Sequence, residues 1–253
     1  TQKNISYYRI HSKEIELEAL ARHRYFENLN MSFGPYFYYY QSNYSDNNKN
    51  ILSNYRQLGL DSASVFGKKS YLGAKLSFMF DNRNNDVFPT RGIFWNNELL
   101  YSAGINKESN NYSKFISDMT IYASVKDPAK IVGVLRFGGG RIFGNKYAYF
   151  QALDLGANNY LHGFRKNRFA GKSNMYASME LRFKLFDVNS FILSGPLGLT
   201  GFYDIGRVWT KHNDNNKWHS SFGGGLYFVP FNRFVISFSA GFSEQERMFN
   251  YSL

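Results

Sequence analysis

Several common features are absent from this sequence, and each absence excludes a class of protein. It contains no cysteine, so disulfide frameworks and thiolate metal sites are excluded. No segment approaches the roughly 20 apolar residues that a membrane-spanning helix requires. No Walker loop and no HExxH motif is present, so nucleotide and metal cofactors are not indicated. No signal peptide begins at Thr1, and we therefore expect a mature chain or an excised domain.

Aromatic residues are abundant instead, with 25 Phe and 20 Tyr contributing to an aromatic fraction of 19%. Hydrophobic residues make up an ordinary 43%, and the mean hydropathy is negative. A negative average can conceal strands in which every second residue is apolar, so that one face of a sheet is apolar throughout. The composition therefore favours an all-β chain with one apolar face.

Apolar and polar residues alternate with a period of two along most of the chain, which indicates strands. About twelve strands are predicted, at 5–10, 14–25, 29–41, 71–80, 93–101, 112–125, 130–143, 174–185, in a segment ending at 209, and at 218–228, 234–242 and 248–253. Many have ten or more residues, whereas strands of soluble proteins have about 5–6. A tilted transmembrane strand needs roughly 9–11 residues, so the lengths predict a transmembrane antiparallel β-barrel spanning residues 1–253.

The connections between the predicted strands alternate in length. Short connections at 26–29, 81–92, 126–129, 186–195 and 229–232 alternate with others that include long loops at 42–69 and 144–171. Short turns at one end and long extracellular loops at the other are typical of outer-membrane barrels, and an even strand count puts both termini at the periplasmic, short-turn end. A soluble sandwich or propeller is the alternative, but it predicts shorter strands and no such alternation.

The net charge of +11 is compatible with solubility, with nucleic acid binding or with anionic lipid headgroups. The basic residues are scattered, and no compact basic run of the nucleic-acid-binding type occurs, so we expect no nucleic acid partner. Outer-membrane lipid or lipopolysaccharide is the expected partner, at about 1 kcal/mol per favourable charge near the surface. One further feature is the run Gly138-Gly139-Gly140, which leaves space on a sheet face or allows a sharp bend.

Three motifs, taken in order, carry a resemblance to a known family. The first is the turn Phe88-Pro89-Thr90-Arg91-Gly92, which follows a strand ending at Asp81. The second is Leu161-His162-Gly163-Phe164, followed by Asn167-Arg168-Phe169-Ala170-Gly171 and by Glu180-Leu181-Arg182-Phe183. The third is Gly201-Phe202-Tyr203-Asp204-Ile205-Gly206-Arg207-Val208-Trp209. In this order and spacing they resemble the BamA/TamA superfamily of outer-membrane barrels, also called the bacterial surface antigen family.

The resemblance implies a Gram-negative outer-membrane barrel whose long loop folds into the lumen. In the family, a loop Arg contacts inward carboxylates of the following strands. His162 occupies that position here, so we expect His162 or Arg165 to contact Asp204 and Glu180, with Gly163, Phe164 and Gly206 completing the contact. Histidine is charged only when its pKa permits, so the hold on the loop is expected to depend on pH. The plainer alternative is that the contact merely keeps the loop in place as a plug.

Family barrels usually have sixteen strands. Five predicted strands follow the loop here, as in the family, but only seven precede it. Four N-terminal strands and the periplasmic POTRA modules are therefore expected to be absent. The chain is then a fragment, a closed twelve-stranded barrel, or a sheet whose edges pair with a second copy, because an open edge in lipid needs a partner. We favour the twelve-stranded barrel and keep a homodimer as an alternative.

Three classes of function compete. The resemblance implies membrane-protein insertion or protein or lipid translocation, in which a weak seam lends strand edges to client outer-membrane proteins, or a membrane module of a larger assembly. A small plugged pore, or an anchor for a separate phosphoesterase or patatin-type domain, is the second class. The third is an outer-membrane enzyme, but the five histidines accompany no recognisable nucleophile motif. We therefore predict a non-enzymatic barrel without cofactor or metal.

Overall fold

The computed structural model describes residues 7, 9–56, 61–144, 147–157, 161–190, 193–210 and 217–252. Its strands are β1 (Lys13–Glu18), β2 (Ala21–Phe26), β3 (Leu29–Ser42), β4 (Gly67–Asp81), β5 (Gly92–Gly104), β6 (Tyr112–Ser124), β7 (Ile131–Phe143), β8 (Leu153–Leu155), β9 (Phe169–Gly171), β10 (Ser173–Val188), β11 (Gly195–Trp209), β12 (His219–Phe228), β13 (Ile236–Ser243) and β14 (Arg247–Ser252). Helices are short, namely α1 (Tyr44–Asn47), α2 (Ser62–Val65) and the 3-10 segments Ile51–Asn54, Tyr149–Gln151 and Pro230–Asn232. None of the described helices is long and apolar enough to cross a membrane.

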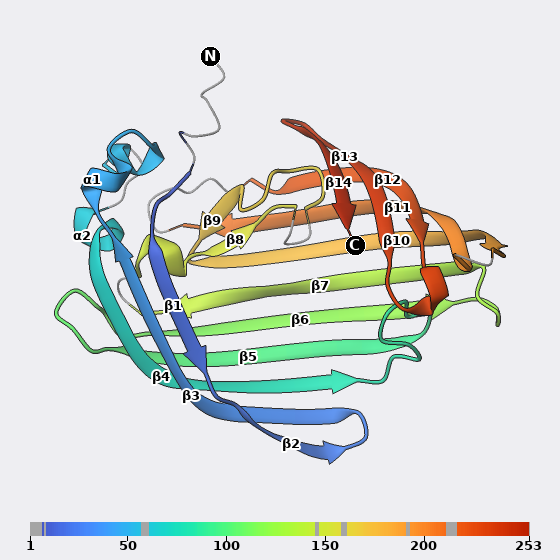
Figure 1. Ribbon diagram of the computed structural model, residues 1–253, viewed down its shortest axis with the longest axis horizontal. Coiled ribbons are helices and arrows are strands. Elements are labelled where there is room, and N and C mark those ends of the chain that lie inside the picture. Colours follow the sequence, from blue (N-terminus) through green and yellow to red (C-terminus); the bar gives the residue numbers. More distant parts are fainter. Residues whose placement is uncertain are drawn as a thin grey trace.

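Twelve of the strands form one antiparallel sheet that follows the order of the chain. The order is β1-β3-β4-β5-β6-β7-β10-β11-β12-β13-β14, and β2 pairs with β3 beside β1. Figure 1 shows this sheet curling strongly, with β1 to β3 at one side and β12 to β14 bending over at the other. Strands β8 and β9 form a separate pair inside the curve. The predicted all-β, barrel-type fold is confirmed, including the five strands that follow the long loop.

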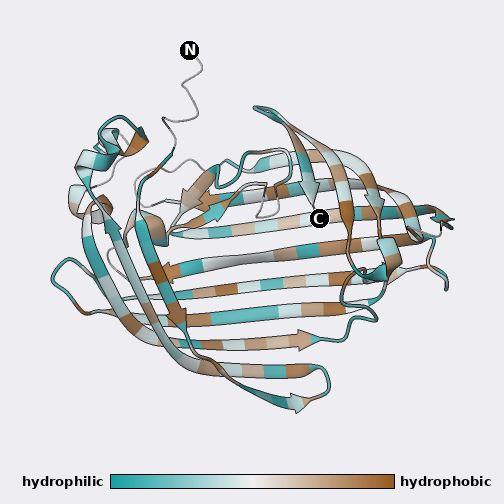
Figure 2. Ribbon diagram, viewed as in Figure 1, coloured by the Kyte–Doolittle hydropathy of each residue, from teal (hydrophilic) through white to brown (hydrophobic). Residues whose placement is uncertain are grey.

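The two faces of the sheet differ as the period of two requires. Leu135, Met179 and Leu181 are among many large apolar side chains exposed on the outer face. Tyr40 and Asp204 are fully buried on the inner face. Figure 2 shows the resulting alternation of apolar and polar residues along the long strands. An apolar outer face and a polar, aromatic interior are what a barrel in lipid needs.

The sheet contains twelve strands, as predicted, but they are not the twelve strands that the sequence predicted. The strand expected at 5–10 is not formed at Arg9 and Ile10, and most of its other residues lie outside the described part of the chain. The strand expected at 14–25 divides into β1 and β2, which share one register against β3 as far as Arg24. The division lies opposite Pro35, which accepts a hydrogen bond from Ala19 N (3.3 Å) but has no N–H to donate in return.

The two longest connections, 43–66 and 144–172, lie at the same end of the sheet, but the strand ends correct one expectation. Lys13 pairs with Gln41 beside the long connection 43–66, so β1 begins at the long-loop end. The last strand, β14, ends at Ser252, which pairs with Ser237 at the short-turn end. The first and last described strands therefore start and finish at opposite ends. The expectation that both termini share the short-turn end does not hold for the ends of the first and last described strands, because β1 and β2 together cross the sheet once.

The described ladders stop at β1 and β2 on one side and at β14 on the other. No ladder between these edges occurs in the described residues. The connection from β7 to β10, residues 144–172, is called the inner loop here, and its described residues 147–157 and 161–171 lie in the interior between these edges (Figure 1). The long loop predicted to enter the lumen does so.

Candidate functional site

The inner loop is fixed at its start by aromatic stacking on the first strands of the sheet. Phe150 stacks on Tyr40 of β3, with ring centroids 3.9 Å apart, and the hydroxyls of Tyr149 and Tyr40 are 3.0 Å apart. Tyr71 of β4 meets the edge of Phe150 at 6.4 Å. Aromatic pairs at these separations contribute about 0.5–1.5 kcal/mol each beyond their area burial. This first contact region anchors the loop on β3 and β4.

The second half of the inner loop packs on the opposite side of the interior. Leu155, Leu161 and Phe164 are buried with Tyr176 of β10 in one apolar cluster. Gly206 of β11 makes room for it, because a Cβ there would lie 3.0 Å from Leu155 Cδ1 and 3.4 Å from Leu161 Cδ1. Burying each large apolar side chain contributes about 1.5–3 kcal/mol. Burial of these side chains brings the loop against β10 and β11.

The carboxylate of Asp204 accepts hydrogen bonds from the inner loop beside this apolar cluster. Asp204 is fully buried, and its Oδ1 accepts from Ser178 Oγ at 2.7 Å. Its Oδ2 accepts from Ser221 Oγ at 2.9 Å and from the backbone N–H of His162 at 3.0 Å. The His162 ring joins at the same oxygen, with Nδ1 3.0 Å away. We call these four residues the Asp204 cluster.

Strand register assembles the Asp204 cluster. Ser178 of β10 lies directly opposite Asp204 of β11, which in turn lies opposite Ser221 of β12. Directly paired residues point to the same face of a sheet, so two hydroxyls flank the carboxylate without any loop rearrangement. A buried charge is tolerated because it is hydrogen-bonded on both oxygens.

Glycine at position 163 allows the loop to approach the sheet closely. Gly163 N donates to Ser221 Oγ at 3.2 Å. A Cβ at Gly163 would lie 2.6 Å from Ser221 Cβ and 2.9 Å from the backbone of Phe242. A Cβ at Gly241 would likewise meet His162 O at 2.6 Å. Glycines on both sides therefore bring the loop backbone against β12 and β13.

The inner loop also contacts the last hairpin. Asn250 Nδ2 of β14 donates to His162 O at 2.9 Å. Glu246, in the turn before β14, accepts from the backbone N–H of Arg165 at 2.9 Å. Its carboxylate also pairs with Arg165 Nε at 3.7 Å and Arg168 Nε at 3.4 Å. A single loop thus touches β3 and β4 at its start and the β13–β14 hairpin at its end.

The charge state of His162 is biased by its neighbours. Burial alone would lower the pKa of His162, but the hydrogen bond and the negative charge of Asp204, with a contribution from Glu180, raise it above the ordinary value. Arg136 opposes this effect. The His162 side chain keeps 37% of its surface accessible, so protons can reach it. The cluster therefore combines a titratable contact with backbone and hydroxyl contacts that do not titrate.

Two predicted members of the site make other contacts. Arg165 pairs with Glu246 rather than with Asp204. Glu180 pairs with Arg182 at 3.0 Å and accepts from Thr200 Oγ1 at 2.7 Å. Arg182 can pair with Glu180 because residues two apart on one strand point to the same face of the sheet. The structure thus brings His162, Gly163 and Asp204 together and places Phe164 and Gly206 at the adjoining apolar cluster. Of the two alternatives for the contact with Asp204, it selects His162 over Arg165, and Glu180 makes its direct contacts with Arg182 and Thr200 rather than with the loop.

The predicted family turn lies away from the Asp204 cluster, at the short-turn end. Its Phe88 ring is 4.9 Å from the Tyr227 ring, and the Arg182 guanidinium is 4.9 Å from the Phe88 centroid. Arg91 Nε donates to Ser124 Oγ at 2.8 Å. Pro89 directly follows Phe88, and Gly92 has φ 114°, which favours glycine. The turn therefore reaches β10 and β12 through Phe88.

A second buried carboxylate was not predicted. Asp118 of β6 accepts hydrogen bonds from Arg136 Nη2 and Nε, at 2.9 and 3.0 Å respectively, and from the Tyr176 hydroxyl. A Cβ at Gly138 would lie 2.5 Å from that hydroxyl, so the glycine leaves the space that the Tyr176 hydroxyl needs to reach Asp118. Tyr176 also packs on the inner loop. The loop is therefore connected to Asp118 through Tyr176, as well as to Asp204. The glycine run was the signal for this contact, and the strand register was needed to interpret it.

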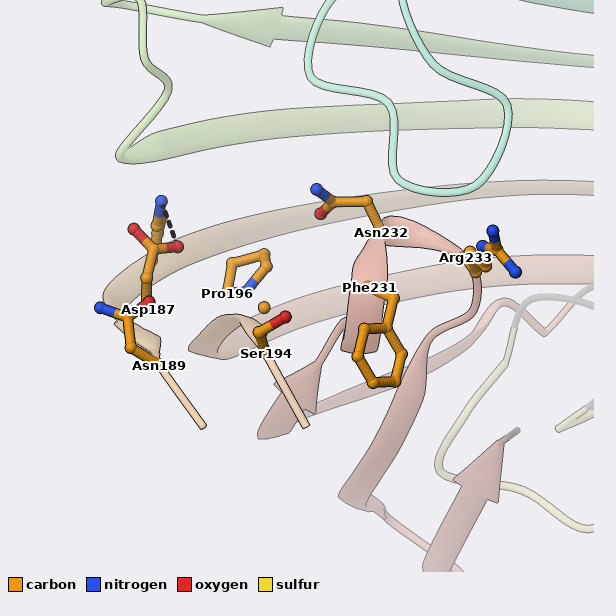
Figure 3. A pocket seen from close by; sticks show the side chains of 9 residues that line it. Asp187, Asn189, Ser194, Pro196, Phe231, Asn232 and Arg233 are labelled. Carbon is orange, nitrogen blue, oxygen red and sulfur yellow. Dashed lines mark ion pairs between the residues drawn. The ribbon is translucent and has the colours of Figure 1, made fainter. Parts of the chain in front are cut away.

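A hollow of about 790 Å³ opens at the short-turn end, between the turns that follow β10 and β12. Figure 3 shows Asp187 on one side and Phe231, Asn232 and Arg233 on the other. Of the two basic residues that line it, Lys184 is paired with Asp187 at 2.7 Å. In the described residues no group of three or more His, Asp or Glu side chains gathers to hold a metal ion.

Comparisons with known proteins agree with this geometry. A sequence profile of the Omp85 superfamily domain matches residues 1–249. The fold is similar to the crystal structure of BamA from Haemophilus ducreyi lacking POTRA domains 1-3, with a TM-score of 0.73 and 15% sequence identity. That similarity covers 95% of this chain and 53% of the BamA chain, so this chain spans about half the length of its structural relative. A search of curated protein sequences gave no match.

Proposed function

The chain belongs to the Omp85 superfamily, and we propose that this outer-membrane barrel acts in membrane-protein insertion or in protein or lipid translocation, without enzymatic activity. One observation carries the proposal. Strand β14 has six residues, its Tyr251 is 79% exposed, and in the described residues the inner loop contacts it while no strand pairs with its outer edge. An edge of this kind offers backbone donors and acceptors to an incoming client strand.

The inner loop supports the same proposal. It contacts β3 and β4 through Phe150 and the last hairpin through Asn250 and Glu246. A loop that bridges both sides of a curved sheet stabilises its curvature when it is bound. Its release would leave β14 held by β13 alone. The Asp204 cluster would then control access to the edge as well as keeping the loop in the lumen.

A cross-linking experiment in proteoliposomes tests this. p-Benzoylphenylalanine replaces Tyr251 of β14 or, as the matched control, Leu135, an outward residue of the central strand β7. The probe client is a urea-unfolded, eight-stranded outer-membrane barrel protein. We expect a client cross-link from position 251 and none from position 135, together with faster client folding than in protein-free liposomes. Equal cross-linking at both positions, or no acceleration, would contradict the proposal.

The plugged-pore alternative rests on the buried contacts of the inner loop in the lumen. It predicts no client cross-link and a small conductance in planar bilayers. A cross-linked species of twice the chain mass without client would instead show that the edge pairs with a second copy. Lipid, lipopolysaccharide, client and second copy all remain proposed partners, and the periplasmic side is assigned to the short turns by analogy with outer-membrane barrels.

A further inference from the structure

A groove of about 870 Å³ crosses the outer face of the sheet over β5, β6, β7, β10 and β11. Trp95, Phe137, Met175 and Trp209 contribute apolar walls. Its floor includes Gly139, the middle glycine of the run. A hollow with apolar walls on a lipid-facing surface is filled by acyl chains, because no water is available there to fill it.

Strand register explains why the groove forms at this point. Gly139 of β7 lies opposite Ser117 of β6 and Met175 of β10, on the outer face. A Cβ at position 139 would lie 2.5 Å from Asn174 O, a backbone atom, so the close strand approach requires glycine. Because Gly139 has no side chain and the neighbouring Ser117 has a short one, the surface is hollow here, whereas elsewhere on the outer face it carries Leu, Met and Phe.

One end of the groove is cationic. Arg141 and Lys172, the last residue of the inner loop, line it at the end where β7 finishes and β10 begins. The lining residues include no Asp or Glu. Lys172 Nζ donates one hydrogen bond to Gly144 O at 2.8 Å, and an ammonium has three donors. In the described residues neither cation forms an ion pair with a carboxylate, and cations at one end with apolar walls along the rest complement an anionic headgroup with an attached acyl chain.

The length of the groove suits one leaflet. Phe137 and Arg141 both line it and are four residues apart on β7. At about 3.3 Å per residue this is about 13 Å along the strand, which is about 10 Å of membrane depth for a strand tilted by about 40°. The hydrocarbon core of one leaflet is about 15 Å deep, half of roughly 30 Å. A chain seated beside Phe137 therefore reaches the cations with its headgroup at the membrane surface.

We propose that this groove is a binding site for a single phospholipid with a net negative headgroup, in the leaflet on the long-loop side, with its phosphate on Arg141 and Lys172 and one acyl chain over Gly139. The proposal depends on the outer-membrane placement of the sheet and not on client insertion. A phosphate bound beside Lys172 would lie at the base of the inner loop, so lipid binding and loop position would be coupled.

Fluorescence quenching in bilayers tests the proposal. The chain has three tryptophans, and Trp218→Phe leaves only Trp95 and Trp209, which both line the groove. In that background, phosphatidic acid with brominated acyl chains is titrated into phosphatidylcholine liposomes. Brominated phosphatidylcholine, which carries no net charge, is the reference lipid. We expect phosphatidic acid to be preferred, and Arg141→Gln and Lys172→Gln each to lower this preference about fivefold, which corresponds to about 1 kcal/mol per charge.

The controls separate the groove from general surface charge. Arg247→Gln removes an exposed arginine at the same end of the sheet, outside the groove, and should leave the preference unchanged. Ser117→Phe fills the groove without altering charge and should reduce quenching by both lipids. Glycerol phosphate should not compete, because it lacks the acyl chain. An unchanged preference in both cation variants, an equal loss in Arg247→Gln, or displacement by glycerol phosphate would overturn the proposal.

Discussion

Asp204 is the residue on which the inner loop depends most directly. Its carboxylate accepts from two strands through Ser178 and Ser221 and from the loop through His162. Hydrogen bonds to a charged group contribute about 1.5–3 kcal/mol each. Because one side chain serves three donors from different segments, its loss should affect the loop more than the loss of any single donor.

Removal of this carboxylate should release the loop. Asp204→Ala leaves the backbone N–H of His162 without its acceptor and costs about 1–3 kcal/mol for that group alone. We expect tryptic cleavage after Arg165, Lys166 and Arg168 to accelerate at least tenfold, measured by mass spectrometry of the fragments. Asp187→Ala, which removes a carboxylate at the short-turn end, is the control. Unchanged protection in Asp204→Ala would contradict the role of the cluster.

The hold on the loop should also depend on pH. The folded pKa of His162 is raised, so its charge stabilises the loop fully below the unfolded pKa near 6.5. That contribution is lost as pH rises through the higher, folded pKa. Cleavage after Lys166, normalised to cleavage after the exposed Lys107, should therefore increase towards alkaline pH. His162→Arg keeps its charge throughout and should give a flat profile; an equally steep profile would exclude His162 as the titrating group.

At the scale of single residues, the sequence indicated His162 and Asp204 because the motifs that contain them resemble those of the family. It could not indicate that Arg165 turns to Glu246, since their contact joins positions 81 residues apart. Nor could it select Ser178 and Ser221. Serines are common on strands, and only the register shows that these two flank Asp204.

Among the elements, the inner loop and the β13–β14 hairpin form a pair that long-range polar contacts hold together. Glu246 is the main link, because its carboxylate serves Arg165 and Arg168 and is only 15% exposed. Its neighbour Glu244 pairs with Lys217 and is 75% exposed. Two glutamates of one turn therefore have different expected importance.

Neutralising Glu246 should loosen both elements at once. In Glu246→Gln we expect faster hydrogen–deuterium exchange in β14 and in residues 161–171, because both ion pairs to the loop are weakened. Glu244→Gln is the matched control and should leave exchange in the loop unchanged. If the two variants behave alike, the loop does not hold the last hairpin through Glu246.

The strands themselves were largely predictable, since a period of two marks an apolar outer face wherever lipid is the solvent. The sequence did not predict the division between β1 and β2, which lies opposite Pro35 of β3, or the short β8–β9 pair. β8 and β9 have three residues each, too few for a period to show. Their pairing depends on the apolar cluster that Leu155 and Leu161 form with the sheet.

For the whole molecule, the inner loop joins the beginning of the sheet to its end. Phe150 packs on β3 and β4, while Asn250 and Glu246 bind the loop from the last hairpin. In the described residues this loop, and no strand ladder, links the two sides. The central claim is therefore that the Asp204 cluster keeps the loop inside the barrel.

Site-directed labelling of one buried loop residue tests that claim most directly. Because the chain has no cysteine, Leu161→Cys introduces a unique thiol at a fully buried position of the inner loop. Its reaction with a membrane-impermeant maleimide is compared with that of Lys107→Cys, in an exposed connection. The account predicts that Leu161→Cys alone is labelled far more slowly than Lys107→Cys, and that adding Asp204→Ala brings it to the same rate. Labelling of Leu161→Cys at the rate of Lys107→Cys with Asp204 intact would contradict it.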